Sequence, residues 1–273
     1  MLEQRLLTAA GLGAFIIASV MLLSTAQLAV LLGGFTLISA WEWGRLSGLS
    51  AAGRIYYILL VSLALGAAWW AQARAAGVWV ISVTALVWWL AAGAWLTRYP
   101  HGEVRAAAMT VVKTAAGVLA LVPAWMALLV LHGQRDGRHL MLFLLVLIWS
   151  ADSGAYFAGR RWGQVKLAPQ ISPGKTRAGV YGAFCATLLW ALAGGVWMGI
   201  QRAQLAQFVV LCLLTVMFSI VGDLFESMLK RYAGVKDSGS LLPGHGGVLD
   251  RVDSLLAAAP IFLLGWKWLW IKM

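Results

Sequence analysis

Acidic side chains in the second half of the sequence lie inside long apolar stretches or at their ends. These residues are Asp152, Asp223, Glu226, Asp250 and Asp253. A carboxylate in such a stretch is costly unless another group compensates its charge. Carboxylates that cluster without His or Cys suit a hard cation, and Mg²⁺ commonly binds one or two of them and keeps positions for substrate phosphates. We therefore expect a Mg²⁺ site that also receives phosphate groups.

The spacing of these acids places them on two helical faces. One face carries Asp223, Glu226, Ser227 and Lys230, which follow one another at helical spacing. Asp250 and Asp253 share a face of the next helix. If the two faces meet, they form an oxygen-lined pocket ringed by Lys and Arg. A second interpretation stays open, in which Asp223 and Asp250 only form ion pairs that orient the helices. The partners would then be Arg231 or Arg251.

The loop at residues 230–253 carries a glycine-rich segment. Gly246 and Gly247 remove side chains where backbone N–H groups could approach a phosphate, just before a helix start whose dipole favours anions. His245 precedes them. We expect His245 to form a turn or a hydrogen bond rather than to act as a base, because a phosphomonoester is largely ionised at neutral pH.

A second polar loop lies at residues 160–176. It contains Gly174-Lys175-Thr176, which invites comparison with a P-loop. Pro169 stands where that motif requires Gly, and no strand is expected before it. We therefore reject a Walker A motif, and treat the lysines of this loop as separate phosphate ligands.

The run from Ser227 to Asp253 resembles the signature of phosphatidate cytidylyltransferases, also called CDP-diacylglycerol synthases. The matching positions are Ser227, Lys230, Arg231, Lys236, Asp237, Gly239, Leu242, Pro243, His245, Gly246, Gly247, Asp250, Arg251 and Asp253. Segments 151–161, 166–169 and 171–176 resemble a second block of the same family. Members of the family often continue this block with Trp-Glu, where the present chain has Arg177-Ala178. Together the two blocks cover about the C-terminal half.

The resemblance implies a reaction in which CTP and phosphatidic acid give CDP-diacylglycerol and pyrophosphate. It also implies that Asp223 and Asp250 hold the metal, with a second ion whose identity stays open. Our hypothesis assigns the remaining residues to two groups. Catalytic roles fall to Ser227, Lys230, Arg231, Lys236, Asp237, His245, Arg251 and Asp253. Substrate binding falls to Asp152, Lys166, Lys175, Gly246 and Gly247.

Two other functions compete with this hypothesis. A CTP-dependent polyprenol or phytol kinase would transfer the γ-phosphoryl group to a lipid alcohol, and it would need His245 or a carboxylate to manage the hydroxyl proton. A secondary transporter would use its carboxylates for ion coupling. Transporters commonly have paired halves with broken helices, whereas the polar blocks here are confined to one half, which disfavours this alternative.

These residues must be positioned by membrane-spanning helices. The 273 residues are 62% hydrophobic and 11% charged, which is outside the usual range of soluble domains. A spanning helix needs about 20 apolar residues. The candidate stretches are 6–23, 26–44, 55–73, 77–97, 109–131, 138–159, 178–200, 204–232 and 252–271. We thus expect an all-α transmembrane bundle of about nine spans that forms one integral membrane domain, 1–273. Within it, 1–135 would supply N-terminal helices and 136–273 the catalytic helices and loops.

The basic residues set the expected orientation and partners. With nine spans, most loop Lys and Arg residues fall on the side that also holds the N-terminus, which predicts a cytoplasmic N-terminus and a cytoplasmic active site. The net charge of +11 is spread over short loops rather than one face, which argues against nucleic-acid binding. The expected partners are CTP, phosphatidic acid and the lipid bilayer, in a bacterial-type inner membrane. A homodimer is one of the oligomeric states left open.

Overall fold

The computed structural model describes residues 2–98, 106–241 and 246–271, and this part of the chain is almost entirely helical. Its helices are α1 (Leu2–Leu22), α2 (Thr25–Leu46), α3 (Ala51–Ala71), α4 (Ala75–Arg98), α5 (Ala106–His132), α6 (Gly137–Trp162), α7 (Arg177–Trp197), α8 (Arg202–Tyr232) and α9 (Leu249–Ile271). The predicted helical fold is confirmed, and each helix matches a predicted stretch to within a few residues. Among the described residues, seven helices, α3 to α9, are long and apolar enough to cross a membrane. A crossing by α1 and α2 stays a prediction.

Hydroxyl side chains begin three of the helices. The Ser24 hydroxyl accepts a hydrogen bond from the Gln27 amide, and the Gln27 side chain accepts one from the Ser24 amide, so that a capping box starts α2. Ser50 caps α3 and Thr176 caps α7 in the same way through their hydroxyls. Gly48, with φ of +86°, makes the turn between α2 and α3. The boundary at Ser24 explains why two apolar runs separated by only two polar residues fold as separate helices.

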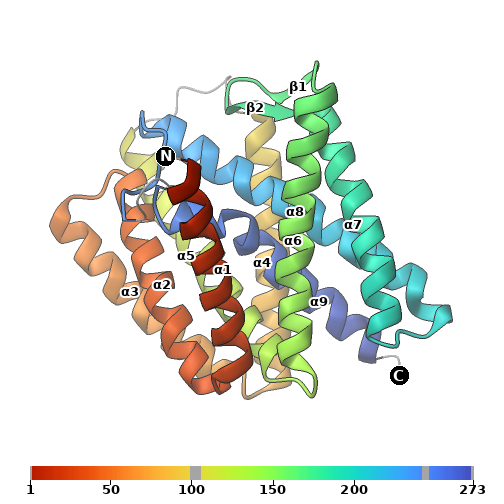
Figure 1. The fold of residues 1–273 in the computed structure, drawn as a ribbon. Helices are drawn as coiled ribbons and strands as arrows, with labels where there is room; N and C mark the ends of the chain where they lie inside the picture. The colour runs from red at the N-terminus through yellow and green to blue at the C-terminus, as the bar shows by residue number, and fades with distance from the viewer. Residues whose placement is uncertain (1, 99–105, 242–245, 272–273) are drawn as a thin grey trace.

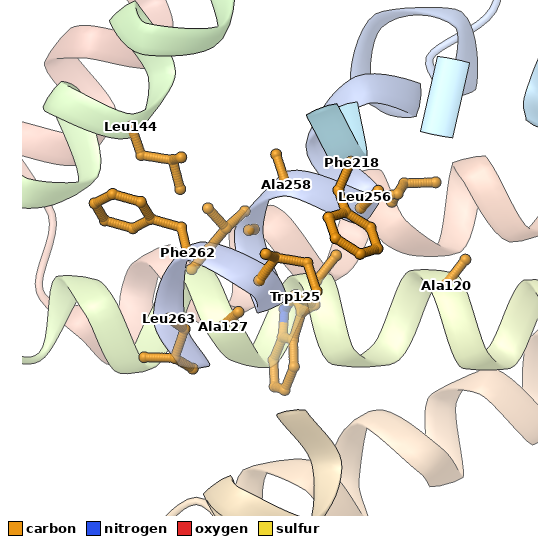
Figure 2. Packing of buried hydrophobic residues seen from close by; sticks show 14 of the residues in the cluster. Ala120, Trp125, Ala127, Leu144, Phe218, Leu256, Ala258, Phe262 and Leu263 are labelled. Carbon is orange, nitrogen blue, oxygen red and sulfur yellow. The ribbon is translucent and has the colours of Figure 1, made fainter. Parts of the chain in front are cut away.

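Helix α9 runs through the middle of the bundle and packs against α2, α4, α5, α6 and α8. Figure 2 shows apolar side chains of α9, among them Phe262, lying between side chains of α5, α6 and α8. Phe262 and Ala258 are fully buried. Because neighbours cover α9 on several sides, its first turn, which carries Asp250, has a fixed position relative to α8.

Small residues bring α6 and α7 into backbone contact. A Cβ atom at Gly154 would lie 2.5 Å from the carbonyl oxygen of Gly182, and one at Gly179 would lie 3.0 Å from that of Ala155. Small residues at such crossings allow close packing of helices in membranes. The close approach places Asp152 of α6 beside the segment that leads into α7.

A short antiparallel hairpin joins α6 to α7, which the all-helical prediction did not include. Strand β1 (Lys166–Ala168) pairs with β2 (Ser172–Thr176). A three-residue strand carries too little alternation to be recognised in a sequence, so this segment was expected to be a loop. Figure 1 shows the hairpin at the same end of the bundle as the start of α1, whereas α9 ends at the opposite end.

Candidate active site

The polar faces of α8 and α9, which the spacing predicted separately for each helix, meet in the structure. The backbones touch at Gly222, where a Cβ atom would lie 2.6 Å from the carbonyl oxygen of Asp253 and 3.1 Å from the Cβ of Ala257. A larger residue at this position would push the helices apart. Gly222 therefore allows the acids of α8 to lie against those of α9.

Lys230 links the two faces. Its ammonium group lies 2.7 Å from Oδ1 of Asp250 and also forms an ion pair with Oε2 of Glu226, one turn earlier in α8. The three side chains are 11%, 6% and 1% exposed, respectively. A buried ammonium between two buried carboxylates offsets part of their desolvation cost. It also fixes the rotation of α8 relative to α9.

Asp250 is held by the loop that precedes it. Its Oδ2 atom accepts hydrogen bonds from the amide of Ser238 at 2.9 Å, the hydroxyl of Ser238 at 2.9 Å and the amide of Gly247 at 2.8 Å. Gly246 has φ of +80°, and a Cβ atom there would lie 2.6 Å from Oδ2. The two glycines thus let the backbone wrap closely around this carboxylate. The glycine-rich pattern predicts that the backbone amides at Gly246 and Gly247 approach a phosphate, whereas in this structure the Gly247 amide donates to Asp250.

Asp223 lies in a more open setting. Its Oδ2 atom is 2.5 Å from the ammonium of Lys175 in β2, and both side chains are about a quarter exposed. The Ser227 hydroxyl approaches Oδ1 at 3.4 Å, which is long for a hydrogen bond. Asp223 also interacts electrostatically with Asp152 of α6 and Asp253 of α9. Acids from three helices therefore converge near one lysine of the hairpin.

Two cavities meet at these acids. One, of about 540 Å³, lies among α1, α2, α5, α6 and α9 and is lined mainly by apolar side chains, with Asp250, Arg251 and Asp253 on its wall. The other, of about 490 Å³, lies among α6, α7, α8 and the hairpin. Its polar lining residues are Asp152, Tyr156, Arg160, Lys166, Lys175, Thr176, Ser219, Asp223 and Ser254. Asp152 and Ser254 line both cavities, so these two residues mark the junction.

Other residues singled out from the sequence lie around this centre. Arg231 donates from Nε to the carbonyl oxygen of Ile171 at 3.1 Å and so ties α8 to the hairpin. Lys236 and Asp237 are exposed on the loop before α9, and Arg251 is exposed at the start of α9. His245 lies outside the described residues.

The alternative interpretation of the acids named the wrong partners. It paired Asp223 and Asp250 with Arg231 or Arg251, whereas the structure pairs Asp223 with Lys175 and Asp250 with Lys230. The reason is geometric, because Lys230 shares the helical face of Asp223 and Glu226, while Arg231 is rotated away toward the hairpin.

Sequence reasoning missed Glu42 of α2. Its carboxylate is 5% exposed, accepts hydrogen bonds from the amides of Val248 and Leu249, and lies within hydrogen-bond distance of the Ser238 hydroxyl. The sequence contained a signal for this residue, because Glu42 is the single acid in the apolar stretch 26–44. A carboxylate there has the same unfavourable free energy of burial as the acids of the second half. Ser238, which contacts both Glu42 and Asp250, carried no comparable signal.

The carboxylate oxygens at this site suit a hard cation, although they do not form a complete set of metal ligands among the described residues. Among the described residues, no three His, Cys, Asp or Glu side chains are gathered closely enough to enclose a metal ion. Mg²⁺ does not require such a cage, because it keeps several waters and binds substrate phosphates. The carboxylate of Asp223, about a quarter exposed, lines the polar cavity. Oε2 of Glu226 forms the ion pair with Lys230, and Oε1 is buried without a hydrogen bond. Oxygen ligands with spare lone pairs are therefore present.

Comparison with known proteins gives one consistent result. Residues 3–268 match the family described as the Cytidylyltransferase family. A phosphatidate cytidylyltransferase from Pseudomonas aeruginosa is 41% identical over 269 residues, which cover 96% of each chain. One from Haemophilus influenzae is 34% identical over 294 residues, covering 96% of this chain and 97% of the relative. One from Brucella suis is 46% identical over 142 residues, about half of each chain.

Proposed function

Because this chain belongs to the cytidylyltransferase family, we propose that it transfers the cytidylyl group of CTP to phosphatidic acid and releases pyrophosphate. The observation that supports this assignment is the junction of two unlike cavities at Asp152 and Ser254. A reaction between a lipid and a nucleotide needs an apolar and a polar compartment that share a boundary. Asp152 lies at that boundary, with Asp223 and Lys175 on the polar side and Asp250 and Asp253 on the apolar side.

The apolar cavity suits the lipid substrate. Leu12, Phe15, Leu31, Phe35 and Leu128 are among its lining residues, and they offer an apolar surface to acyl chains. Arg251 on the same wall is placed to bind the lipid phosphate at the polar end. This arrangement would bring the phosphate of phosphatidic acid to the junction from the side of the bilayer.

The polar cavity suits the nucleotide. Arg160, Lys166 and Lys175 line it and supply cations for a triphosphate. Its volume of about 490 Å³ lies within the range of small-molecule and cofactor sites. Lys175 would exchange its contact with Asp223 for one with phosphate when the nucleotide and its metal bind.

The proposed reaction is an in-line displacement. A phosphate oxygen of phosphatidic acid forms a bond to the α-phosphorus of CTP as the bond from that phosphorus to the bridging oxygen breaks, and pyrophosphate leaves with the electron pair. No base is required, because the lipid phosphate is already ionised. The protein contributes positioning and charge stabilisation through its lysines and arginines. Asp223 and Asp250 would hold Mg²⁺, with Oδ1 of Asp250 exchanging its contact with Lys230 for one with the metal. The bound ion would neutralise charge on the phosphate oxygens.

A product assay tests the proposal. Purified protein in detergent receives phosphatidic acid with CTP labelled at either the α- or the γ-phosphate. We expect the α-label in a lipid product and the γ-label in pyrophosphate, with turnover lost after EDTA treatment and restored by Mg²⁺. Transfer of the γ-label to a lipid with release of CDP would show kinase chemistry and contradict the proposal. Turnover that persists in EDTA would remove the metal assignment.

The proposed topology has nine spans, with the N-terminus and the active site on the cytoplasmic side of the inner membrane. The shared position of the α1 start and the hairpin at one end of the bundle supports it (Figure 1). A thiol reagent that cannot cross membranes tests it in a Cys185→Ser background. We expect Arg135→Cys, in the turn between α5 and α6, to be labelled from outside. Gln170→Cys, in the hairpin loop, should react only after permeabilisation, and the reverse pattern would invert the topology.

A further inference from the structure

Glu42 places a carboxylate from the N-terminal half of the chain inside the loop that precedes Asp250. Its Oε1 atom accepts a hydrogen bond from the Val248 amide at 3.1 Å, and its Oε2 atom accepts one from the Leu249 amide at 2.8 Å. These two amides lie at the start of α9, where backbone N–H groups lack partners within the helix. The negative charge also interacts favourably with the helix dipole. Glu42 thus caps α9 from a distant helix.

Arg45, at the end of the same helix, holds the other side of the loop. Its guanidinium donates to the carbonyl oxygen of Ser238 at 2.5 Å and to that of Asp237 at 3.3 Å. The loop approaches α2 so closely that a Cβ atom at Gly239 or Gly247 would collide with the Glu42 carboxylate. Helix α2 therefore binds this segment in two ways. Glu42 accepts hydrogen bonds from its backbone amides, and Arg45 donates to its carbonyl oxygens.

Ser238 connects Glu42 to Asp250. Its fully buried hydroxyl lies 3.1 Å from Oε2 of Glu42 and 2.9 Å from Oδ2 of Asp250. The amide of Ser238 also donates to Asp250. A change in the position of the Glu42 carboxylate would therefore move Ser238 and the start of α9 together, and both of these set where the Asp250 carboxylate points.

We propose that Glu42 is a positioning residue for the cytidylyl transfer, which acts by fixing the start of α9 and, through Ser238, the orientation of the Asp250 carboxylate. The inference rests on the proposed function only in that Asp250 serves the reaction. It gives helix α2, whose sequence carries none of the family signature, a defined part in the active site. Glu42 does not contact the reacting atoms in this scheme.

The main experiment uses Glu42→Gln, which keeps the shape of the side chain. The amide NH₂ group must face one of the N–H donors at the start of α9, so at least one of the three contacts is lost. We expect kcat to fall about 10- to 100-fold, in the range known for groups that orient metal ligands, with a smaller change in KM for CTP. Hydrogen exchange at the Val248 and Leu249 amides should become faster. The matched control is Ser50→Ala, which removes the cap of α3 without touching the loop, and should leave kcat unchanged.

A double-mutant cycle with Ser238→Ala distinguishes positioning from a general loss of stability. If Glu42 acts through Ser238, the loss of kcat in the double variant should be smaller than the product of the two single losses. Unchanged kcat in folded Glu42→Gln, with only a lower thermal midpoint, would overturn the proposal. If Glu42→Gln does not fold, Ser238→Ala alone must still lower kcat, and an unchanged value would overturn the proposal as well. Cytidylyl transfer by the unmodified protein is measured in parallel, so that a failure of the proposed function is distinguished from a failure of the proposed role of Glu42.

Discussion

Replacing Asp223 by Asn is expected to lower kcat by about 10²- to 10³-fold, which is the loss seen when one preorganised electrostatic contact to a reacting centre is removed. Asn has the same shape but lacks the charge that a hard cation requires. Asp223 and its partner Lys175 are both about a quarter exposed, so the neutral variant leaves Lys175 solvated and the fold intact. The rate of pyrophosphate release, compared with the unmodified protein at saturating CTP and Mg²⁺, measures the effect.

Asp136→Asn is the matched control for Asp223→Asn. Asp136 lies at the start of α6, is exposed and makes no side-chain capping hydrogen bond, so the same chemical change there should leave turnover unchanged. The thermal midpoint of Asp223→Asn should stay close to that of the control. Normal turnover by Asp223→Asn would remove this residue from the metal site, whichever function the chain has.

Replacing Lys230 by Met is expected to lower the free energy of unfolding by about 3–5 kcal/mol, because it leaves two buried carboxylates without their cation. Met fills most of the same volume, so the effect reports the lost charge rather than a cavity. Glu226 and Asp250 are almost fully buried beside Lys230. Thermal or denaturant-induced unfolding in detergent, followed by circular dichroism, measures the change.

A second substitution tests the cause of this instability. Glu226→Gln in the Lys230→Met background removes one of the two uncompensated charges and should restore part of the lost stability. The same substitution in the unmodified protein should destabilise it, because Lys230 then keeps only one partner. Additive effects of the two substitutions would show that Glu226 and Lys230 do not interact, contrary to the ion pair in the structure.

The sequence by itself predicted the helices and the polar faces of α8 and α9, because both depend on patterns within one segment. Apolar length predicted the helical stretches, and spacing along α8 predicted that Asp223, Glu226, Ser227 and Lys230 share a face. The signature between Ser227 and Asp253 predicted the family, which the comparisons confirm. The charges of these residues also predicted that acids would need compensating cations near them.

Only the tertiary structure decided which cation meets which acid and which residues hold the loop. Lys175 reaches Asp223 from a hairpin whose strands are too short to predict, and Arg231 turns to the hairpin instead of to an acid. Glu42 meets the start of α9 from a position more than 200 residues away in the chain. Such contacts depend on how helices pack against one another, and the residue spacing within a single helix does not predict that packing. The free energy of a buried charge can show that a partner must exist, but the identity of the partner follows from the three-dimensional arrangement alone.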